Sequence, residues 1–432
     1  MGMRKNAFWH KRSKLEERLS QIIRAKSQNV CIDGPTGSGK TSLALTVLSR
    51  AGNKIIWIPV VNNMSWVDFC EEIFKTSWRI NSSLSNKGTK ALSINLETTK
   101  PLSVHDLVSP LKFLDRIKFS LNDGNGDQKT LLEASKKWSI SDVEAFINDN
   151  DITILIDDFE KATSELVTKI ADLCKNLTFS AGNKAVIIGT GSTFERLYNS
   201  DEGLDGRLAE ISVASFGSKD EVWHYMNDGF ERLGFNTPRA QLRYKNITKD
   251  DANKIEIALY EAADGMPKYI NELALRICQR ILNDENQSND KKIKVTVNDI
   301  VTESNDMLRE NISRCNKKVK EAERHLRVSV EFRLVLKAVF DMGANSVHSV
   351  DSLIKHVQKI DENFSEEQFE SGIQTLKSLG LYVQTGKSGE VIFAKDPMFS
   401  HVLGLICGNP SKYGKDERLY GLFGQRSLPL NC

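Results

Sequence analysis

The sequence lacks the cysteine and histidine spacings that disulfide frameworks and zinc sites require. Its seven cysteines are an odd number, they are scattered along the chain, and no CxxC pair occurs among them. The seven histidines form no HExxH motif either. These absences argue against a disulfide-stapled extracellular domain and against a zinc site, and they indicate a reducing, cytoplasmic setting.

Long apolar runs are missing as well. None approaches the roughly 20 residues that a membrane-spanning helix needs, and the N-terminal stretch MGMRKNAFWHKRSKLEERL has no apolar centre of the kind found in secretory signals. A strong excess of one charge is also absent, since 59 basic and 57 acidic residues leave a net charge of +2. Bulk electrostatics therefore demands neither a nucleic acid nor an anionic membrane as a partner.

What the chain of 432 residues does contain is an alternation of short apolar runs and helix-like segments in its first half. Strands alternating with helices predict βαβ units and a mostly parallel sheet, which is buried on both faces and therefore apolar throughout. The pattern places strands at NVCID (29–33), KIIWIPV (54–60), ITILIDDFE (152–160), KAVIIGTGS (184–192) and EISVASF (210–216). We expect an α/β fold for this part.

Composition and periodicity divide the chain further. A polar segment rich in Ser, Asn and Gly predicts an insert with one helix near 103–119. The last part predicts three helices followed by a hairpin, an order that is typical of a winged helix. The expected domains are a core at 1–216 with an insert at about 79–135, a helical region at 217–328, a winged helix at 329–408 and a tail at 409–432.

A glycine-rich stretch, IDGPTGSGKTSL, lies between the first expected strand and a helix expected at 41–52. It matches the phosphate-loop motif GxxxxGK[ST] at every fixed position. Glycines let successive backbone N–H groups point at phosphate oxygens, while Lys40 reaches the β- and γ-phosphates and the Thr41 hydroxyl ligates Mg²⁺. The predicted nucleotide-binding residues are Gly34, Pro35, Thr36, Gly37, Ser38, Gly39, Lys40, Thr41 and Ser42.

A phosphate loop needs an acidic partner, and ILIDDFE supplies one at the end of the third expected strand. Asp157 is expected to hold Mg²⁺, directly or through water. Asp158 is placed to orient or deprotonate the attacking water, and Glu160 is the weaker candidate for that role. The alternative is that these acids only end a strand and cap a helix.

Residues near the fourth and fifth expected strands are further candidates for contact with the reacting phosphate. Thr190 or Ser192, in GTGS after the fourth expected strand, could hydrogen-bond the terminal phosphate or the attacking water. Arg207, before the fifth strand, could be an arginine finger supplied to a neighbouring subunit, with Arg196 as a second candidate. Plain turn residues and a solvated surface arginine are the alternatives.

Together these features resemble the AAA+ and STAND ATPases, in which the acidic strand is third in sequence, a sensor residue ends the fourth, and a helical lid follows. ADGMPKYINELA (263–274) is similar to the glycine-x-proline motif at the lid of STAND and initiator-type ATPases, which implies that Pro267 packs near the adenine of ATP. FWHKRSKLEERL (8–19) resembles the start motif of STAND proteins, which implies a contact between Arg12 and the nucleotide. Here Lys11 stands where that motif has glycine.

The resemblance also extends to the C-terminal part, because EVIFAKDPMFSHVL (390–403) is similar to the end of the winged helix in archaeal-type ATPases of this group. It implies a five-stranded P-loop sheet in the order 5-1-4-3-2, a helical lid and a winged-helix domain. It further implies an ATPase that uses ATP and Mg²⁺. Asp158 stands where AAA+ enzymes usually have glutamate. Because its carboxylate lies one methylene short, and a misplacement of about 1 Å costs on the order of 100-fold in rate, hydrolysis is expected to be slow.

The resemblance leaves two functions open. The first is an ATP-driven switch that oligomerises or regulates a partner or effector protein, with bacterial anti-phage defence as one setting in which such proteins are abundant. The second is a DNA-binding ATPase of the replication-initiator or transposition-regulator type. Between residues 330 and 400 there are ten acids and seven bases, a net charge of −3, and the third expected helix opens with Glu366, Glu367 and Glu370. Phosphate contacts need Lys or Arg, so this charge favours the switch.

Overall fold

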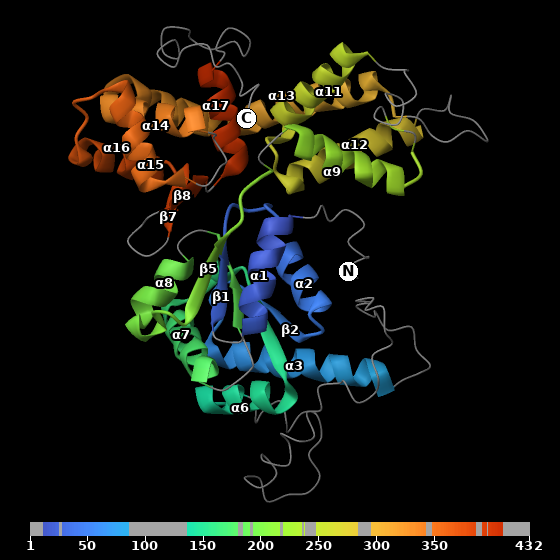
Figure 1. Ribbon diagram of the computed structural model, residues 1–432, viewed down its shortest axis with the longest axis vertical. Helices are drawn as coiled ribbons and strands as arrows, with labels where there is room; N and C mark the ends of the chain where they lie inside the picture. Colours follow the sequence, from blue (N-terminus) through green and yellow to red (C-terminus); the bar gives the residue numbers. More distant parts are fainter. Residues whose placement is uncertain are drawn as a thin grey trace, which may run out of the picture. The chain divides into compact units, whose positions relative to one another are not determined.

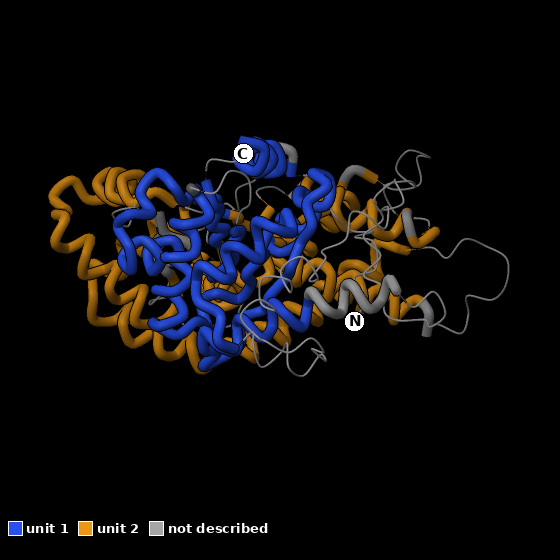
Figure 2. Tube along the Cα trace, turned by 90° about the horizontal axis from the view of Figure 1, so that it is seen from below, with its two compact units in different colours: residues 1–6, 11–33, 40–212 blue, residues 7–10, 34–39, 213–432 orange. Residues whose placement is uncertain are grey.

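The computed structural model describes residues 12–25, 28–85, 136–179, 185–190, 193–216, 219–235, 237, 248–283, 295–342, 348–385, 391–394 and 396–408. Four predictions lie outside these residues: the helix near 103–119 with most of the insert, the tail at 409–432, Ser192, and residues 8–11 of the start motif. The chain forms two compact units, coloured separately in Figure 2. Within the described ranges, the first contains residues up to 33 and 40–212, and the second contains 34–39 and the residues from 213 onwards.

The first unit is built on a five-stranded sheet in the order β2-β3-β4-β1-β5 (Figure 1). All four strand pairs are parallel. The strands are β1 (Asn29–Asp33), β2 (Lys54–Pro59), β3 (Ile152–Asp157), β4 (Ala185–Ile188) and β5 (Leu208–Ser212). This is the predicted order 5-1-4-3-2 read from the other edge, so the expected α/β fold is confirmed.

Helices cover both faces of this sheet, as its apolar strands require. α1 (Ser13–Ala25) and α2 (Lys40–Arg50) contact each other, and they also contact β5 and β4 respectively. The opposite face carries α3 (Trp66–Ser85), α6 (Ile140–Asn150), α7 (Ser164–Phe179) and α8 (Thr193–Ser200). The short 3-10 turn η2 (Phe159–Lys161) precedes α7, and η3 (Glu202–Leu204) follows α8.

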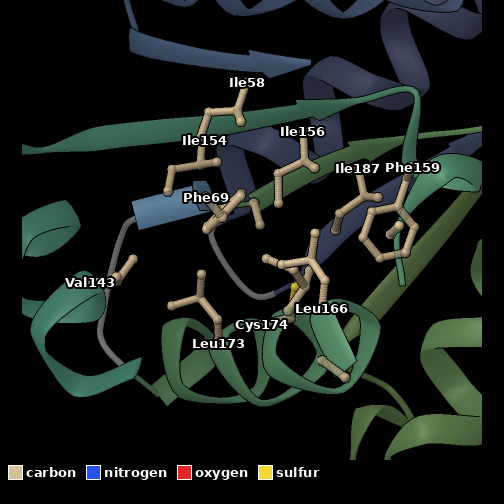
Figure 3. Close-up of a cluster of buried hydrophobic side chains, with 14 of the residues drawn as sticks. Ile58, Phe69, Val143, Ile154, Ile156, Phe159, Leu166, Leu173, Cys174 and Ile187 are labelled. Atoms are coloured by element: carbon tan, nitrogen blue, oxygen red, sulfur yellow. The ribbon is translucent and has the colours of Figure 1, made fainter. Parts of the chain in front are cut away.

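The larger core of this unit lies between the sheet and that second set of helices. Ile154 and Ile156 project from β3 towards Phe69 of α3 and Leu166 of α7, and all four side chains are fully buried (Figure 3). Burying such a side chain is worth about 1.5–3 kcal/mol. The core therefore fixes β3, and with it the acidic segment that follows.

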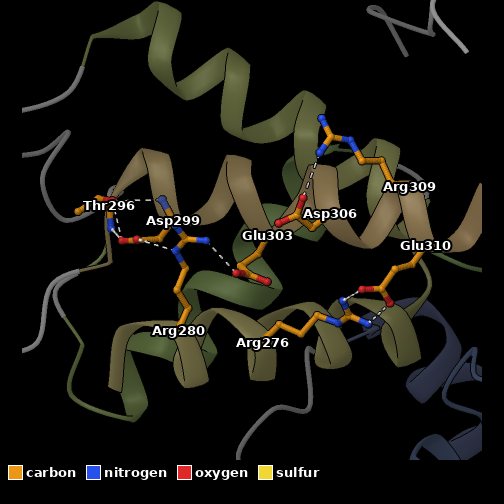
Figure 4. A network of polar contacts seen from close by, with 8 residues as sticks. All are labelled: Arg276, Arg280, Thr296, Asp299, Glu303, Asp306, Arg309 and Glu310. Carbon is orange, nitrogen blue, oxygen red and sulfur yellow. Dashed lines mark hydrogen bonds and ion pairs between the residues drawn. The ribbon is translucent and has the colours of Figure 1, made fainter. Parts of the chain in front are cut away.

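After residue 213, the described part of the second unit first contains the helices α9 (Lys219–Arg232), α11 (Lys249–Ala263), α12 (Pro267–Asn283) and α13 (Val297–Val328). They enclose a core of their own. On its surface α12 and α13 are joined by ion pairs, in which Arg276 donates to both carboxylate oxygens of Glu310 and Arg280 lies 3.1 Å from Glu303 (Figure 4).

The second unit continues with α14 (Val330–Met342), β6 (His348–Ser349), α15 (Val350–Ile360), α16 (Glu366–Ser378), β7 (Tyr382–Thr385), β8 (Val391–Ala394) and α17 (Pro397–Gly408). The three strands pair antiparallel in the order β6-β8-β7. Three helices followed by a hairpin is the expected element order, and its assignment as a winged helix stays a prediction. Among the described residues, no helix has both the length and the apolarity to cross a membrane.

α13 belongs to both cores of this second unit. Its N-terminal half contributes Ile300 and Met307 to the core of the first four helices. Its C-terminal half contributes Val319 and Leu326 to the core that also contains α14 to α17. One continuous helix therefore belongs to both the helical region and the C-terminal module.

A close approach between α14 and α16 provides a test of this packing. A Cβ atom on Gly372 would lie 2.7 Å from Cγ2 of Val335 and 2.9 Å from the carbonyl oxygen of Glu331. We expect Gly372→Ala to lower the free energy of unfolding by about 1–3 kcal/mol, because overpacking outweighs the better helix propensity of alanine. Urea unfolding followed by circular dichroism measures this. The control Gln374→Ala, on the exposed side of α16, should change stability by less than about 0.5 kcal/mol. An unchanged or higher midpoint for Gly372→Ala would contradict the close packing.

Candidate functional site

The six residues 34–39 connect the end of β1 with the start of α2, as the phosphate-loop motif predicts. Gly37 and Gly39 adopt φ angles of +87° and +93°, which side chains other than glycine rarely tolerate. Gly37 is also crowded, because a Cβ there would lie 2.6 Å from Cβ of Lys268, whose N–H donates to the Gly37 carbonyl over 3.2 Å. The hydroxyl of Ser38 is buried without a hydrogen-bond partner. A buried unpaired donor in such a loop fits an anion.

Lys40 is the first residue of α2, and only 7% of it is exposed. Burial lowers the pKa of its ammonium group to about 8, and Glu160, Asp33, Asp157 and Asp158 oppose this shift by stabilising the charge. Four carboxylates therefore act electrostatically on one ammonium group. This arrangement is held at the carboxyl edge of the sheet, where α2 starts.

The Thr41 hydroxyl and the Asp157 carboxylate meet at this edge. Thr41 donates to Oδ2 of Asp157 over 3.0 Å across 116 residues of sequence, and the N–H of Asp158 donates to Oδ1 over 3.0 Å. Burial raises the pKa of the Asp157 carboxyl, and these hydrogen bonds act against that shift. The pair fits Mg²⁺, which binds few protein oxygens and keeps several waters. Among the described residues, no cluster of three or more His, Cys, Asp or Glu side chains could hold a metal.

Asp158 and Glu160, the two candidates for orienting the attacking water, have different hydrogen-bond and ion-pair partners. Asp158 has a left-handed backbone (φ 56°, ψ 37°), and its carboxylate lies 2.7 Å from Nζ of Lys161 with 48% of the side chain exposed. Glu160 instead accepts the N–H of Thr190 over 3.1 Å, and it is the first among the four carboxylates in its influence on Lys40. The geometry thus joins Glu160, rather than Asp158, to the end of β4.

Arg196 of α8 holds the turn that carries Glu160. Its guanidinium group donates to the carbonyl oxygens of Phe159, Glu160 and Ala162 and lies over the Phe159 ring. Its hydrogen bonds are therefore made within its own chain, which is unsuited to an arginine finger. The sequence offered no signal for this contact, because the carbonyl groups belong to a turn more than thirty residues away.

Arg207 lies at the other edge of the sheet. Its carbonyl accepts the N–H of Asn29, the first residue of β1, whereas the phosphate loop follows the last residue of that strand. Because parallel strands place their amino ends together, Arg207 is a strand length away from Lys40 of its own chain. A role as a finger would require the site of another subunit, so it stays a prediction that depends on assembly.

The two residues implied by resemblance occupy helix starts. Pro267 is the first residue of α12, where proline is favoured, and it precedes the Lys268 that contacts the phosphate loop. Arg12 precedes α1, and its N–H donates to the carboxylate of Glu16, which is paired with Arg50. A nucleotide contact for Pro267 and Arg12 stays a prediction, as do the roles of Pro35, Thr36 and Ser42.

Two residues near the loop escaped the sequence analysis. Asp33, the last residue of β1, is fully buried; its Oδ2 accepts the N–H of Phe194 and its Oδ1 has no partner. Burial raises the pKa of this carboxyl. Trp57 of β2 donates its indole N–H to Asp157. A strand-end acid and a strand tryptophan are too common in α/β sheets to signal a site.

The pKa of Lys40 predicts how anion binding depends on pH. A bound polyphosphate favours the charged lysine, so affinity is fully present below about pH 8 and is lost as the pH rises above that value. For ADP we expect the affinity to fall by up to about tenfold per pH unit between about pH 8 and pH 9.5. Calorimetry across this range measures it. Lys161→Ala is the control, because the pKa of Lys161 is raised by Asp158 and that lysine stays charged throughout. An ADP affinity that is constant over the range would contradict the prediction.

No protein-family model matches this chain, and no curated protein matches it. Solved structures that it resembles include the Walker-type ATPase PABY2304 of Pyrococcus abyssi, with 15% identity, a TM-score of 0.47, and coverage of 93% of this chain and 98% of that one. The ORC2 protein of Aeropyrum pernix gives 10% identity, a TM-score of 0.45, and coverage of 94% and 96%. A STAND protein with a tetratricopeptide-repeat sensor, PH0952 from Pyrococcus horikoshii, gives 17% identity and a TM-score of 0.36, and the match covers 93% of this chain and 43% of that longer one. At these TM-scores and identities, function has to be inferred from the chain's own residues.

Proposed function

We propose that this protein binds ATP with Mg²⁺ at the carboxyl edge of its sheet and hydrolyses it slowly. The observation that carries the proposal is the hydrogen bond between Thr41, directly after the phosphate-loop lysine, and Asp157 at the end of β3. These two oxygen ligands come from motifs 116 residues apart, and each motif alone has an ordinary structural explanation. Their meeting beside a buried lysine supports a site for a metal–polyphosphate complex.

The chain's own groups divide the work at this site. The N–H groups of the glycine-rich loop and the ammonium group of Lys40 hold phosphate oxygens, and the buried Ser38 hydroxyl gains a partner there. Thr41 and Asp157 hold the metal ion, which when bound neutralises charge on the transferred phosphate. The identity of the base as adenine rests on the resemblance, and Pro267 and Arg12 are its proposed contacts.

Glu160 is the better candidate for orienting the attacking water. Its carboxylate accepts the N–H of Thr190 at the end of β4 and acts electrostatically on Lys40, whereas that of Asp158 is paired with Lys161 and half exposed. Thr190, whose N–H binds Glu160, is then placed to contact the same water or the terminal phosphate. Arg207 of a neighbouring subunit is the proposed source of further positive charge.

The hydrolysis proposal is tested by two isosteric substitutions. We expect Glu160→Gln to lower the rate of phosphate release by about 100-fold or more, while ADP affinity changes by less than about twofold. Asp158→Asn is the matched control, because asparagine tolerates the left-handed backbone, and it should keep most of the activity. Lys40→Ala should lose nucleotide binding altogether. Loss of turnover in Asp158→Asn with normal turnover in Glu160→Gln would assign the water to Asp158 instead.

We further propose that nucleotide binding acts as a switch on a partner or effector protein. Within the second unit, the phosphate loop bonds to Lys268 at the start of α12, and the helical region is joined to the C-terminal module. One link is α13, and another is the buried His401 of α17, whose Nε2 donates to the Glu261 carbonyl over 2.7 Å and whose Nδ1 lies 3.3 Å from Asp264. A conformational change at the phosphate loop could therefore reach this module through α12, α13 and the contacts of His401.

DNA binding remains the second candidate function, and the negative charge of the C-terminal module disfavours it. Glu366 and Glu367 are exposed in the first turn of α16, the third helix of the module, which is capped by Ser365. Acids there suit a helix start in water and repel a phosphate backbone. A protein partner is therefore favoured over duplex DNA.

The switch predicts a change of assembly with nucleotide. With a slowly hydrolysed ATP analogue, we expect the particle mass measured by light scattering to rise by at least about twofold, because ATP-driven assembly brings subunits together. Glu160→Gln should assemble with ATP itself, and Lys40→Ala should not assemble. ATP-sensitive binding to duplex DNA that weakens steeply with salt, without a change of mass, would favour the DNA-binding function.

A further inference from the structure

The indole of Trp57 makes an unexpected contact with the proposed metal ligand. Its Nε1–H donates to Oδ2 of Asp157 over 3.2 Å. β2 and β3 pair in parallel, with Trp57 opposite Leu155 and Pro59 opposite Asp157. Side chains two residues apart on a strand share a face, so the indole reaches along that face towards the end of β3.

The contact completes a set of neutral donors on one carboxylate. Oδ2 of Asp157 accepts from Thr41 and from Trp57, and Oδ1 accepts from the N–H of Asp158. A carboxylate has about four lone-pair sites. Three donors therefore fix the rotation of the group and leave one site, on Oδ1, for a metal ion or its water.

Trp57 differs in this respect from a core tryptophan. Trp66 is buried, stacks on Phe69 and donates its indole N–H to the carbonyl of Trp138. Trp57 is only partly buried, and its N–H is directed at Asp157, the acid to which Thr41 also donates. Its hydrogen bond thus serves the site rather than the packing of the sheet.

We propose that Trp57 is a positioning residue of the magnesium site, whose indole N–H orients the Asp157 carboxylate for the metal ion. The inference rests on the proposed nucleotide-binding function. The role predicts that loss of the indole N–H reduces the gain in nucleotide affinity that Mg²⁺ provides. Nucleotide binding without metal should stay intact, because the phosphate loop and Lys40 are unchanged.

The test compares ADP affinity by calorimetry with Mg²⁺ and with EDTA. For Trp57→Phe we expect the gain in affinity from Mg²⁺ to shrink by about tenfold, as is typical for loss of a hydrogen bond to a metal ligand. Affinity in EDTA should stay within about twofold of the wild type. Trp66→Phe is the matched control, because it loses an indole hydrogen bond elsewhere in the same unit, and its gain from Mg²⁺ should equal that of the wild type.

A spectroscopic reading separates positioning from a general loss of stability. In protein labelled with ¹⁵N-tryptophan, the indole resonance that disappears in Trp57→Phe belongs to Trp57. We expect this resonance to shift on addition of ADP with Mg²⁺ and to move much less with ADP in EDTA. Two results would overturn the role of Trp57 without affecting the proposed function. One is an indole resonance that does not respond to Mg²⁺. The other is a gain in ADP affinity from Mg²⁺ that is the same in Trp57→Phe as in the wild type. Failure of the wild type to bind ADP under either condition would overturn the proposed function together with it.

Discussion

The common direction of the five strands is the constraint on which the candidate site depends. Because β1, β3 and β4 run in parallel, their carboxyl ends meet at one edge of the sheet. The phosphate loop, Asp157 and Thr190 each follow one of these ends, so they converge although they are far apart in the sequence. The same constraint sends Arg207, which precedes β5, to the opposite edge.

The site contains several carboxylates, and the hydrogen bonds to Asp157 come from neutral donors. Four carboxylates act on one buried lysine, and the hydrogen bonds to Asp157 come from a hydroxyl, a backbone N–H and an indole. The nearby cation Arg196 donates to backbone carbonyl groups instead. A site with this balance suits an anion that arrives with a divalent cation, because the cation offsets the carboxylates.

In the second unit, the continuity of α13 explains how two helical parts behave as one body. This helix of 32 residues contributes to both cores without interruption, so the two parts share one element. The buried contact between His401 of α17 and Asp264, which directly follows α11, adds a second connection. These features support the proposed switch, in which the phosphate loop and the C-terminal module respond together.

The strand order was implied by the resemblance. The sequence by itself determined the class of the fold, the position of the phosphate loop, and the choice of Thr41 and Asp157 as candidate metal ligands. It did so because each depends on local signals: glycines at fixed spacing, apolar runs, and an acid directly after a strand. Only the tertiary structure decided the directions of Asp158 and Glu160, the contacts of Arg196 and the attachment of Trp57 to Asp157. Those depend on a left-handed backbone at Asp158 and on donors from distant segments, which residue spacing along the chain does not encode.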